Sequence, residues 1–114
     1  MKYRLRIVDE AYSDIRRNAD WWRDHYSFTE AEEWSFAILS KIRTMDQFPE
    51  SHSLAYENPE VPYDLREALF GLRSRPGYRI LFTVVDADVI VLGVRAAEQD
   101  WLQAEDLPPV PPNT

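Results

Sequence analysis

Cysteine is absent from this chain of 114 residues. Its absence excludes disulfides, thiolate catalysis and cysteine-based metal sites, and it agrees with a reducing compartment. Glycine is also scarce: only Gly71, Gly77 and Gly93 occur, and they form no phosphate-binding loop. The two histidines, His25 and His52, do not have the spacing of a histidine–glutamate metal motif. We therefore expect neither a metal site nor a cofactor.

A long apolar run is missing too. No stretch approaches the roughly 18 apolar residues that a membrane-spanning helix needs. The N-terminus is not followed by the apolar stretch of a secretory signal. We therefore expect a cytoplasmic protein with no membrane partner. A chain of this length corresponds to one domain and can bury roughly 65% of its unfolded surface without a cross-link.

Charge is abundant but unevenly distributed. The net charge of −7 argues against non-specific nucleic-acid binding through the bulk surface. Between residues 66 and 95, however, five arginines stand against three carboxylates, a local balance of +2, so the remainder carries −9. A cationic segment on an acidic body predicts one specific surface for an anion or an acidic partner. The arginines are Arg66, Arg73, Arg75, Arg79 and Arg95.

The N-terminal half has the periodicity of one strand and two helices. Residues 3–8 alternate apolar with basic side chains, which predicts a strand, and Asp9 is expected to cap the helix that follows. Thr29 and Glu32 have the spacing of a capping box for a second helix, which Pro49 should end. A short link between two amphipathic helices predicts an antiparallel hairpin. The apolar stripes are Ala11, Ile15, Ala19, Trp22 and Tyr26, then Ala31, Trp34, Ile38, Ile42 and Met45.

Several residues of these helices have a structural interpretation. Trp22 and Trp34 lie on the stripes, so we interpret them as core residues, whereas Trp21 and Trp101 could contact a partner. A first helical turn rich in carboxylates is explained by the helix dipole rather than by a metal. These carboxylates are Glu30, Glu32 and Glu33.

Three strands are predicted in the second half of the chain. Apolar runs bounded by turn-forming residues place them at 65–72, 78–85 and 89–95. The predicted fold class is α+β, with an N-terminal strand, an antiparallel helix hairpin and a three-stranded antiparallel meander. Residues 1–102 should form this single domain.

Two segments lie outside the predicted helices and strands. Residues 49–64 contain three prolines and form a loop long enough to suspect a function. Residues 103–114 contain four prolines and are expected to be a flexible tail.

The last hairpin can be assigned a register. If residues 86–88 form a three-residue loop, Val85 lies opposite Val89, and Arg79 lies opposite Arg95. A two-residue turn would shift these pairs. One face is then apolar and should pack on the helices; it contains Ile80, Phe82, Val84, Ile90, Leu92 and Val94.

Arg79 and Arg95 become neighbours on the other face. Like charges directly opposite each other are destabilising, so the pair predicts an anion that both guanidinium groups hold. The alternative is that both are solvated, or pair with Asp100 or Glu98, because surface arginines are common. As a surface residue, Arg79 should contribute little to stability.

The sequence of the three strands resembles a known superfamily. The stretches Leu65-Arg66-Glu67-Ala68-Leu69, Tyr78-Arg79-Ile80-Leu81-Phe82 and Val91-Leu92-Gly93-Val94-Arg95-Ala96-Ala97-Glu98-Gln99-Asp100 resemble the C-terminal half of RelE/ParE proteins. These are toxins of type II toxin–antitoxin modules, often described as plasmid stabilisation proteins. With the order of elements, the resemblance extends from about Leu5 to Leu102.

The resemblance implies a partner and a target. It implies a cognate antitoxin whose acidic segment covers the toxin and prevents growth inhibition. Arg66, Arg79 and Arg95 match positions that are basic in many members, and with Arg73 and Arg75 they are our candidates for antitoxin or target binding. ParE-like members poison DNA gyrase without chemistry of their own. RelE-like members cleave ribosome-bound mRNA, for which Arg79 and Arg95 would be the catalytic candidates.

The chain departs from the ribonuclease pattern of this superfamily. Many relatives have Arg-His-Ala where this chain has Arg95-Ala96-Ala97, so a candidate general acid or base is missing. We interpret His25 and His52 as solvated residues. Gyrase inhibition is therefore favoured. The alternatives are a ribosome-dependent endoribonuclease and a non-toxic binding module on the same fold.

Overall fold

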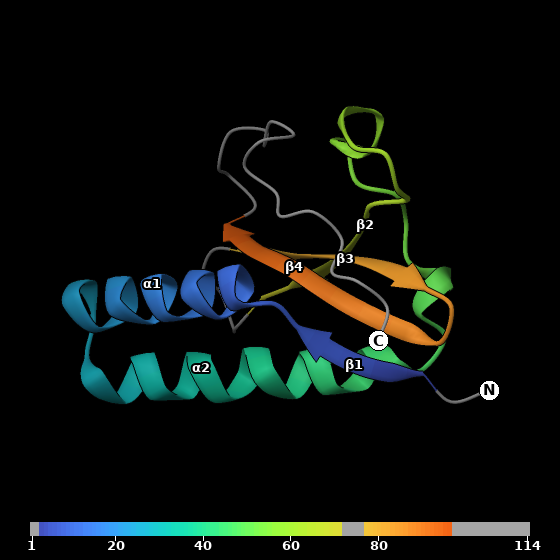
Figure 1. The fold of residues 1–114 in the computed structure, drawn as a ribbon. Helices are drawn as coiled ribbons and strands as arrows, with labels where there is room; N and C mark the ends of the chain where they lie inside the picture. The colour runs from blue at the N-terminus through green and yellow to red at the C-terminus, as the bar shows by residue number, and fades with distance from the viewer. Residues whose placement is uncertain (1–2, 72–76, 97–114) are drawn as a thin grey trace.

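The computed structural model describes residues 3–71 and 77–96. Its elements follow the predicted order of strand, helix hairpin and meander, which confirms the fold class (Figure 1). The helices and strands are β1 (Arg4–Ile7), α1 (Asp9–His25), α2 (Phe28–Arg43), β2 (Arg66–Phe70), β3 (Tyr78–Val85) and β4 (Asp88–Ala96). Between α2 and β2 lie the short 3-10 turns η1 (Thr44–Asp46), η2 (Pro49–Ser51) and η3 (Asn58–Glu60).

The strands form one sheet in the order β1-β4-β3-β2. β1 runs parallel to β4, and the other neighbours are antiparallel. The first strand therefore lies beside the last, and the helix hairpin belongs to the connection between them. Figure 1 shows α1 and α2 side by side as one layer against the sheet.

The main core lies between the sheet and the helix hairpin. It confirms the predicted stripes, except that Tyr26 follows the last residue of α1 and is 43% exposed. Burial of apolar side chains at helical spacing is what holds such amphipathic helices on a sheet. The buried helix residues are Ala11, Ile15, Trp22, Ala31, Trp34, Ile38 and Ile42, joined by Met45 of η1.

The helix boundaries differ from the predicted ones. Val8 occupies the cap position of α1 and Asp9 is its first residue. Ser27, not Thr29, caps α2: its Oγ accepts a hydrogen bond from the backbone N of Glu30 at 3.1 Å. The predicted capping box was therefore two residues late. At the other end α2 stops at Arg43 and continues as η1, well before Pro49.

The turn between β3 and β4 has two residues rather than the predicted three. Val85 pairs with Asp88, and Asp86 adopts a φ of 54°, a left-handed conformation that aspartate tolerates. The predicted pairs near the turn are therefore wrong by one residue. As a consequence, Ile90 and Leu92 lie in the cluster on the face away from the helices.

A bulge restores the predicted register farther along the hairpin. The pairing shifts between Leu81 and Phe82, and beyond that point Arg79 lies opposite Arg95 as predicted. The extra residue of the bulge compensates for the residue missing from the turn. Phe82 faces the helix core, as expected.

The sheet is also covered on the face that points away from the helices. There the segment from residue 53 to residue 65, which we call the covering segment, packs on β3 and β4 through a second apolar cluster. Leu81, Ile90 and Leu92 are buried in it. Most of the predicted loop at 49–64 thus belongs to a segment that packs on this face of the sheet. The cluster contains Ala55, Leu65, Leu81, Ile90 and Leu92, with Val61 and Tyr63 partly buried against it.

α1 protects the edge of β4 beyond the end of β1. Oδ2 of Asp14 accepts a hydrogen bond from the backbone N of Val94 at 2.9 Å. A Cβ atom at Gly93 would lie 3.1 Å from that same oxygen. Glycine therefore permits the close approach between helix and strand.

Candidate functional site

The predicted arginine pair lies on the sheet face that points away from the helices. Arg79 of β3 pairs with Arg95 of β4, and Leu69 of β2 pairs with Arg79 from the other side. Side chains opposite each other in neighbouring strands share a face. We call this part of the sheet the arginine face.

Arg79 is not a surface residue. Its side chain is 9% exposed, and its Nη1 and Nη2 donate to the two carboxylate oxygens of Glu57 at 3.1 and 2.6 Å. Nη1 also donates to Oε1 of Glu67 at 3.0 Å. The premise that Arg79 is a surface residue is therefore wrong. Because one guanidinium group compensates two carboxylates in a place that water hardly reaches, we now expect its replacement to be destabilising.

The hydrogen bonds from Arg79 also favour its charged form. The hydrogen bond with Glu57 is the largest cause that raises the pKa of Arg79, against the opposing effect of burial, and Glu67 adds to it. Arg79 stays charged, and its charge is used inside the protein. With 9% of its side chain exposed, it offers little surface to an external anion.

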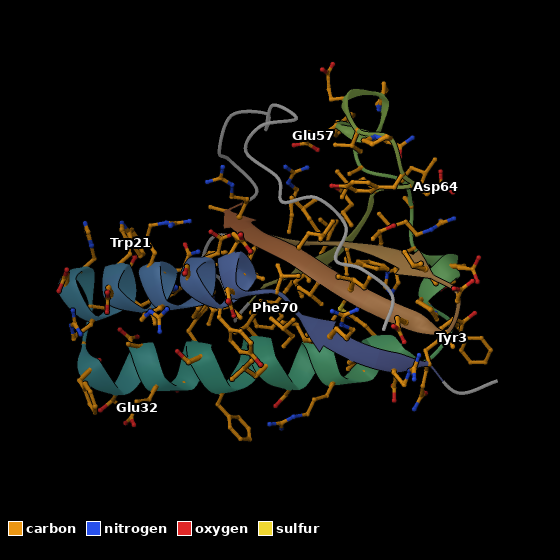
Figure 2. The ribbon with its side chains drawn as sticks, viewed as in Figure 1. Tyr3, Trp21, Glu32, Glu57, Asp64 and Phe70 are labelled. Carbon is orange, nitrogen blue, oxygen red and sulfur yellow. The ribbon has the colours of Figure 1, made fainter. Side chains whose placement is uncertain are left out.

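The local structure of the covering segment positions Glu57. The backbone N of Leu65 donates to Oδ1 of Asn58 at 2.8 Å, and the N of Asn58 donates to the carbonyl of Ala55 at 3.0 Å. These bonds close the segment on itself around η3. Glu57 is fully buried beneath it, and Figure 2 shows it on the side of the sheet opposite the helices.

Arg95 has a different environment from Arg79. It is half-buried and has no ion pair with any residue in 3–71 or 77–96. Its predicted alternative partners, Asp100 and Glu98, lie outside the described residues, as do Arg73 and Arg75. On the described part of the arginine face, Arg95 is therefore the more accessible of the two arginines.

Arg66 lies on the opposite face of the sheet. It pairs with Phe82, which belongs to the helix-side core, and its Nη1 donates to the carbonyl of His52 at 2.6 Å. The structure therefore brings Arg79 and Arg95 together and separates Arg66 from both.

The two histidines also lie apart from the arginine face. His25 is exposed and stacks on Trp21 with ring centroids 4.3 Å apart. His52 is half-buried rather than solvated, with its ring edge-on to Phe82 at 5.5 Å. Burial, then the charges of Lys41 and Arg66, lower the pKa of His52. Neither ring can transfer a proton at Arg79 or Arg95.

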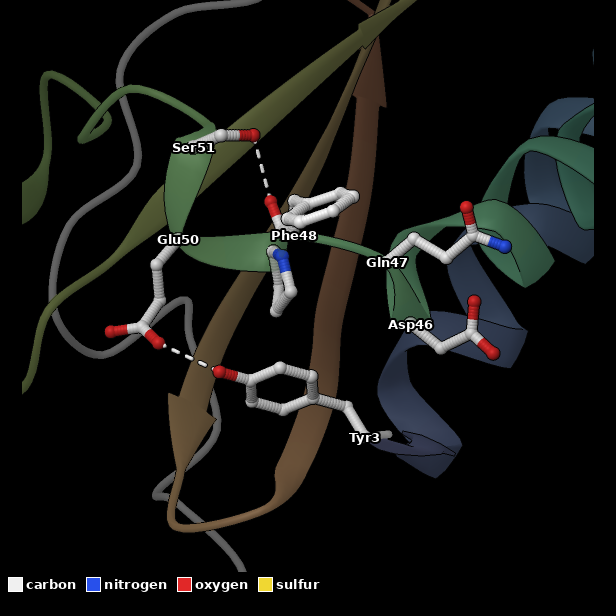
Figure 3. A pocket seen from close by; sticks show the side chains of 7 residues that line it. Tyr3, Asp46, Gln47, Phe48, Glu50 and Ser51 are labelled. Atoms are coloured by element: carbon white, nitrogen blue, oxygen red, sulfur yellow. Dashed lines mark hydrogen bonds between the residues drawn. The ribbon is translucent and has the colours of Figure 1, made fainter. Parts of the chain in front are cut away.

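A shallow pocket lies where the N-terminus meets the turns after α2 (Figure 3). It is lined by Tyr3 and residues 46–51, and the hydroxyl of Tyr3 donates to Glu50 at 2.9 Å. The lining contains two carboxylates and no basic side chain. It therefore does not suit an anionic ligand.

The described residues contain neither a membrane-spanning helix nor a metal site. No helix within residues 3–71 and 77–96 is long and apolar enough to cross a membrane. In that part of the chain, no group of three potential ligands could hold a metal ion.

Sequence reasoning missed Glu57 and Glu67 as partners of Arg79. The signal available was the composition of β3 and β4, which are apolar on both faces. Strands of that kind are covered on both sides. The sequence therefore indicated that a segment packs over the arginine face, but it did not indicate that this segment places Glu57 beside Arg79.

Comparison with known proteins concerns the fold. No family model and no curated protein matches the chain. Among solved structures, the chromosomal ParDE system of P. aeruginosa matches with a TM-score of 0.67 and 18% identity, over 85% of this chain and 98% of that chain. The chain has the RelE/ParE fold.

Two E. coli structures with the RelE/ParE fold also match. The free toxin RelE, in a form with two arginines replaced by alanine, is 24% identical over 86% of both chains, with a TM-score of 0.52. The intact RelBE toxin–antitoxin complex is 24% identical over 85% of this chain and 99% of that chain, with a TM-score of 0.50. The resemblance inferred from the strand motifs is thus confirmed at the level of the fold.

Proposed function

We propose that this chain is the toxin of a type II toxin–antitoxin module, and that it inhibits growth in the cytoplasm unless a cognate antitoxin is bound. The observation that carries the proposal is the match to the ParDE, RelE and RelBE structures over at least 85% of the chain. Two of those structures are toxin–antitoxin assemblies, which supports an antitoxin as partner. Residues 1–102 would form the toxin domain.

For the target we favour ParE-like inhibition of DNA gyrase, without cleavage chemistry. Cleavage of ribosome-bound mRNA would need an accessible cation and a proton carrier close together. Arg79 is held by two internal carboxylates, and Ala96 follows Arg95. These features support a binding role. A non-toxic binding module on the same fold is the remaining alternative.

Arg95 is the arginine that we assign to contact with the acidic antitoxin segment or the target. Arg66, Arg73 and Arg75 remain proposed binding residues. Arg79 would hold the covering segment on the arginine face through its ion pair with Glu57. Replacing Arg95 with alanine removes one charge-assisted contact, which corresponds to roughly 1.5–3 kcal/mol, or about ten- to hundredfold in affinity.

The first test is growth. Cells expressing the chain alone should stop growing, and co-expression of the small reading frame beside its gene should restore growth. Arg95→Glu should weaken antitoxin binding or reduce toxicity, whereas Arg43→Glu, an exposed arginine of α2, should change neither. Normal growth with a folded, expressed wild-type chain would contradict the toxin assignment and support the non-toxic module.

A second test separates the two targets. In a purified translation system, the proposed gyrase inhibitor should leave the message intact, and with gyrase it should accumulate cleaved DNA. Cleavage of ribosome-bound message would instead establish the endoribonuclease.

A further inference from the structure

The charges of Lys41 and Arg66 both act on the ring of His52. Lys41 lies in the last turn of α2, Arg66 is the first residue of β2, and His52 lies in the connection between them. Nη1 of Arg66 donates to the carbonyl of His52 at 2.6 Å. All three residues are half-buried. The cluster thus combines two permanent cations with one ionisable ring.

The backbone around this cluster is fixed by hydrogen bonds. Leu54 forms an antiparallel bridge with Arg66, and the N of Glu67 donates to the carbonyl of Ser53 at 3.0 Å. The ring of His52 rests edge-on against Phe82 at an interplanar angle of 89°. The backbone that carries Arg66 and the ring of His52 are therefore held in place before any ligand arrives, which reduces the entropy lost on binding.

The charges of the cluster are not compensated by carboxylates. Within residues 3–71 and 77–96, no ion pair involves Lys41 or Arg66. The groups that act on His52 are Lys41 from α2 and Arg66 from β2, and its third neighbour is the neutral ring of Phe82 from β3. Uncompensated cations stand out in a chain with a net charge of −7.

We propose that Lys41, His52 and Arg66 form a binding site for a phosphate group. Guanidinium and ammonium groups are the usual donors to phosphate oxygens, and the imidazole supplies a third donor. Two fixed positive charges match a phosphate dianion, which a single carboxylate does not. This site lies on the other face of the sheet from Arg79 and Arg95. Of the proposed binding residues it contains only Arg66, and it does not depend on the toxin assignment.

Binding and protonation of His52 should be coupled. A bound phosphate favours the charged form of the ring, so it raises the pKa of His52. By linkage, a phosphate species of given charge binds more tightly when His52 is protonated.

The two histidines of the chain allow a direct test by proton NMR. We expect pyrophosphate to raise the titration midpoint of the His52 ring signals, compared with sodium chloride at the same ionic strength. The His25 ring lies at the end of α1 and serves as the internal control. Equal movement of both histidines, or of neither, would overturn the site.

The pyrophosphate affinity of single variants tests which side chains donate to the phosphate. Lys41→Gln should weaken pyrophosphate binding about tenfold, as expected for one charge-assisted contact. Arg43→Gln removes a charge from the same turn of α2 and should leave binding unchanged. Lys41 is preferred to Arg66 for this test, because Arg66 also holds the backbone at His52. Unchanged affinity in a folded Lys41→Gln protein would contradict the proposal.

Competition identifies the source of the phosphate. Displacement of pyrophosphate by single-stranded oligothymidylate would assign the site to a nucleic-acid backbone. Binding of pyrophosphate without such displacement would assign it to free phosphates or nucleotides. Displacement by a poly-glutamate peptide at the same charge concentration would refute the preference for phosphate.

Discussion

Arg79 joins two carboxylates beneath the covering segment, and its replacement should destabilise the protein. In Arg79→Ala, the fully buried Glu57 would lose the guanidinium group that donates to both of its carboxylate oxygens. Loss of one partner of a buried ion pair typically costs about 3–5 kcal/mol. Urea unfolding should show a loss of this size. Arg95→Ala is the matched control on the neighbouring strand, and its loss should stay within about 1 kcal/mol.

A double variant tests whether the loss of stability in Arg79→Ala comes from leaving the charge of Glu57 in place. In Arg79→Leu/Glu57→Leu, both charges of this buried pair are removed together, and Glu67 is partly exposed and can be hydrated. Most of the stability lost in Arg79→Ala should return. If it does not, the packing of the guanidinium, rather than its charge, is what matters.

Phe82 is the largest apolar side chain that β3 contributes to the helix-side core, and it is fully buried. Phe82→Ala should cost about 3–5 kcal/mol, because it leaves a cavity between the sheet and both helices. Leu69→Ala is the control, since Leu69 is 66% exposed. A loss below about 1 kcal/mol for Phe82→Ala in a thermal melt would contradict this packing.

At the scale of elements, the start of α2 offers a sharp test. Ser27→Ala removes the hydroxyl that accepts from the backbone N of Glu30, and it should cost about 1 kcal/mol. Thr29→Ala should have a much smaller effect, because Thr29 already lies inside the helix. Equal losses for the two variants would mean that the helix begins later than Phe28.

The elements themselves were predictable because their signals are local. An apolar stripe repeats with the period of a helix, and the stripe of α2 was buried as expected, including Trp34 and Ile38. The start of α2 was not predicted correctly, because two overlapping hydroxyl–carboxylate spacings, from Ser27 and from Thr29, compete for the cap.

The register of the last hairpin shows where local signals end. The observed two-residue turn has a left-handed φ at Asp86, and the sequence Asp86-Ala87-Asp88 would also permit a three-residue loop. The bulge then depends on packing across the whole sheet, so no short window contains it. Arg79 and Arg95 were paired correctly because they lie beyond the bulge.

The burial of Arg79 required information from distant residues. Its partner Glu57 is 22 positions away, in a segment without helical or strand periodicity. The apolar character of both faces of β3 indicated a cover, but nothing in the sequence specified which acidic residue it would deliver. The sequence thus predicted that Arg79 and Arg95 are neighbours, but it did not predict the ion pairs of Arg79 with Glu57 and Glu67.

For the whole molecule, His52 should link stability to pH. Its pKa in the folded protein lies below the ordinary value of 6.5, chiefly because of burial and then because of Lys41 and Arg66. The unfolded chain therefore binds more protons in that range, so stability falls as the pH drops below 6.5 towards the folded pKa. The difference in unfolding free energy between the wild type and His52→Gln should shrink over this window. A constant difference would contradict the assignment.

The C-terminal tail lies outside the described residues, and its role remains a prediction. Deletion of residues 108–114 should leave the melting temperature unchanged, because a proline-rich segment forms no packed element. It could still reduce affinity for a partner, since an extended segment loses little entropy on docking. A large fall in melting temperature would show that the tail packs on the domain.

Both outer strands of the sheet leave little open backbone. β1 has four residues, two of them arginines, and on β2 the N of Glu67 already donates to the covering segment at Ser53. Among the described residues, the uncovered stretch of β2 is 68–70, which spans about 10 Å. A second copy would find no long edge on these strands to extend. The fold therefore resists edge-to-edge aggregation when the chain is synthesised faster than a partner can bind it.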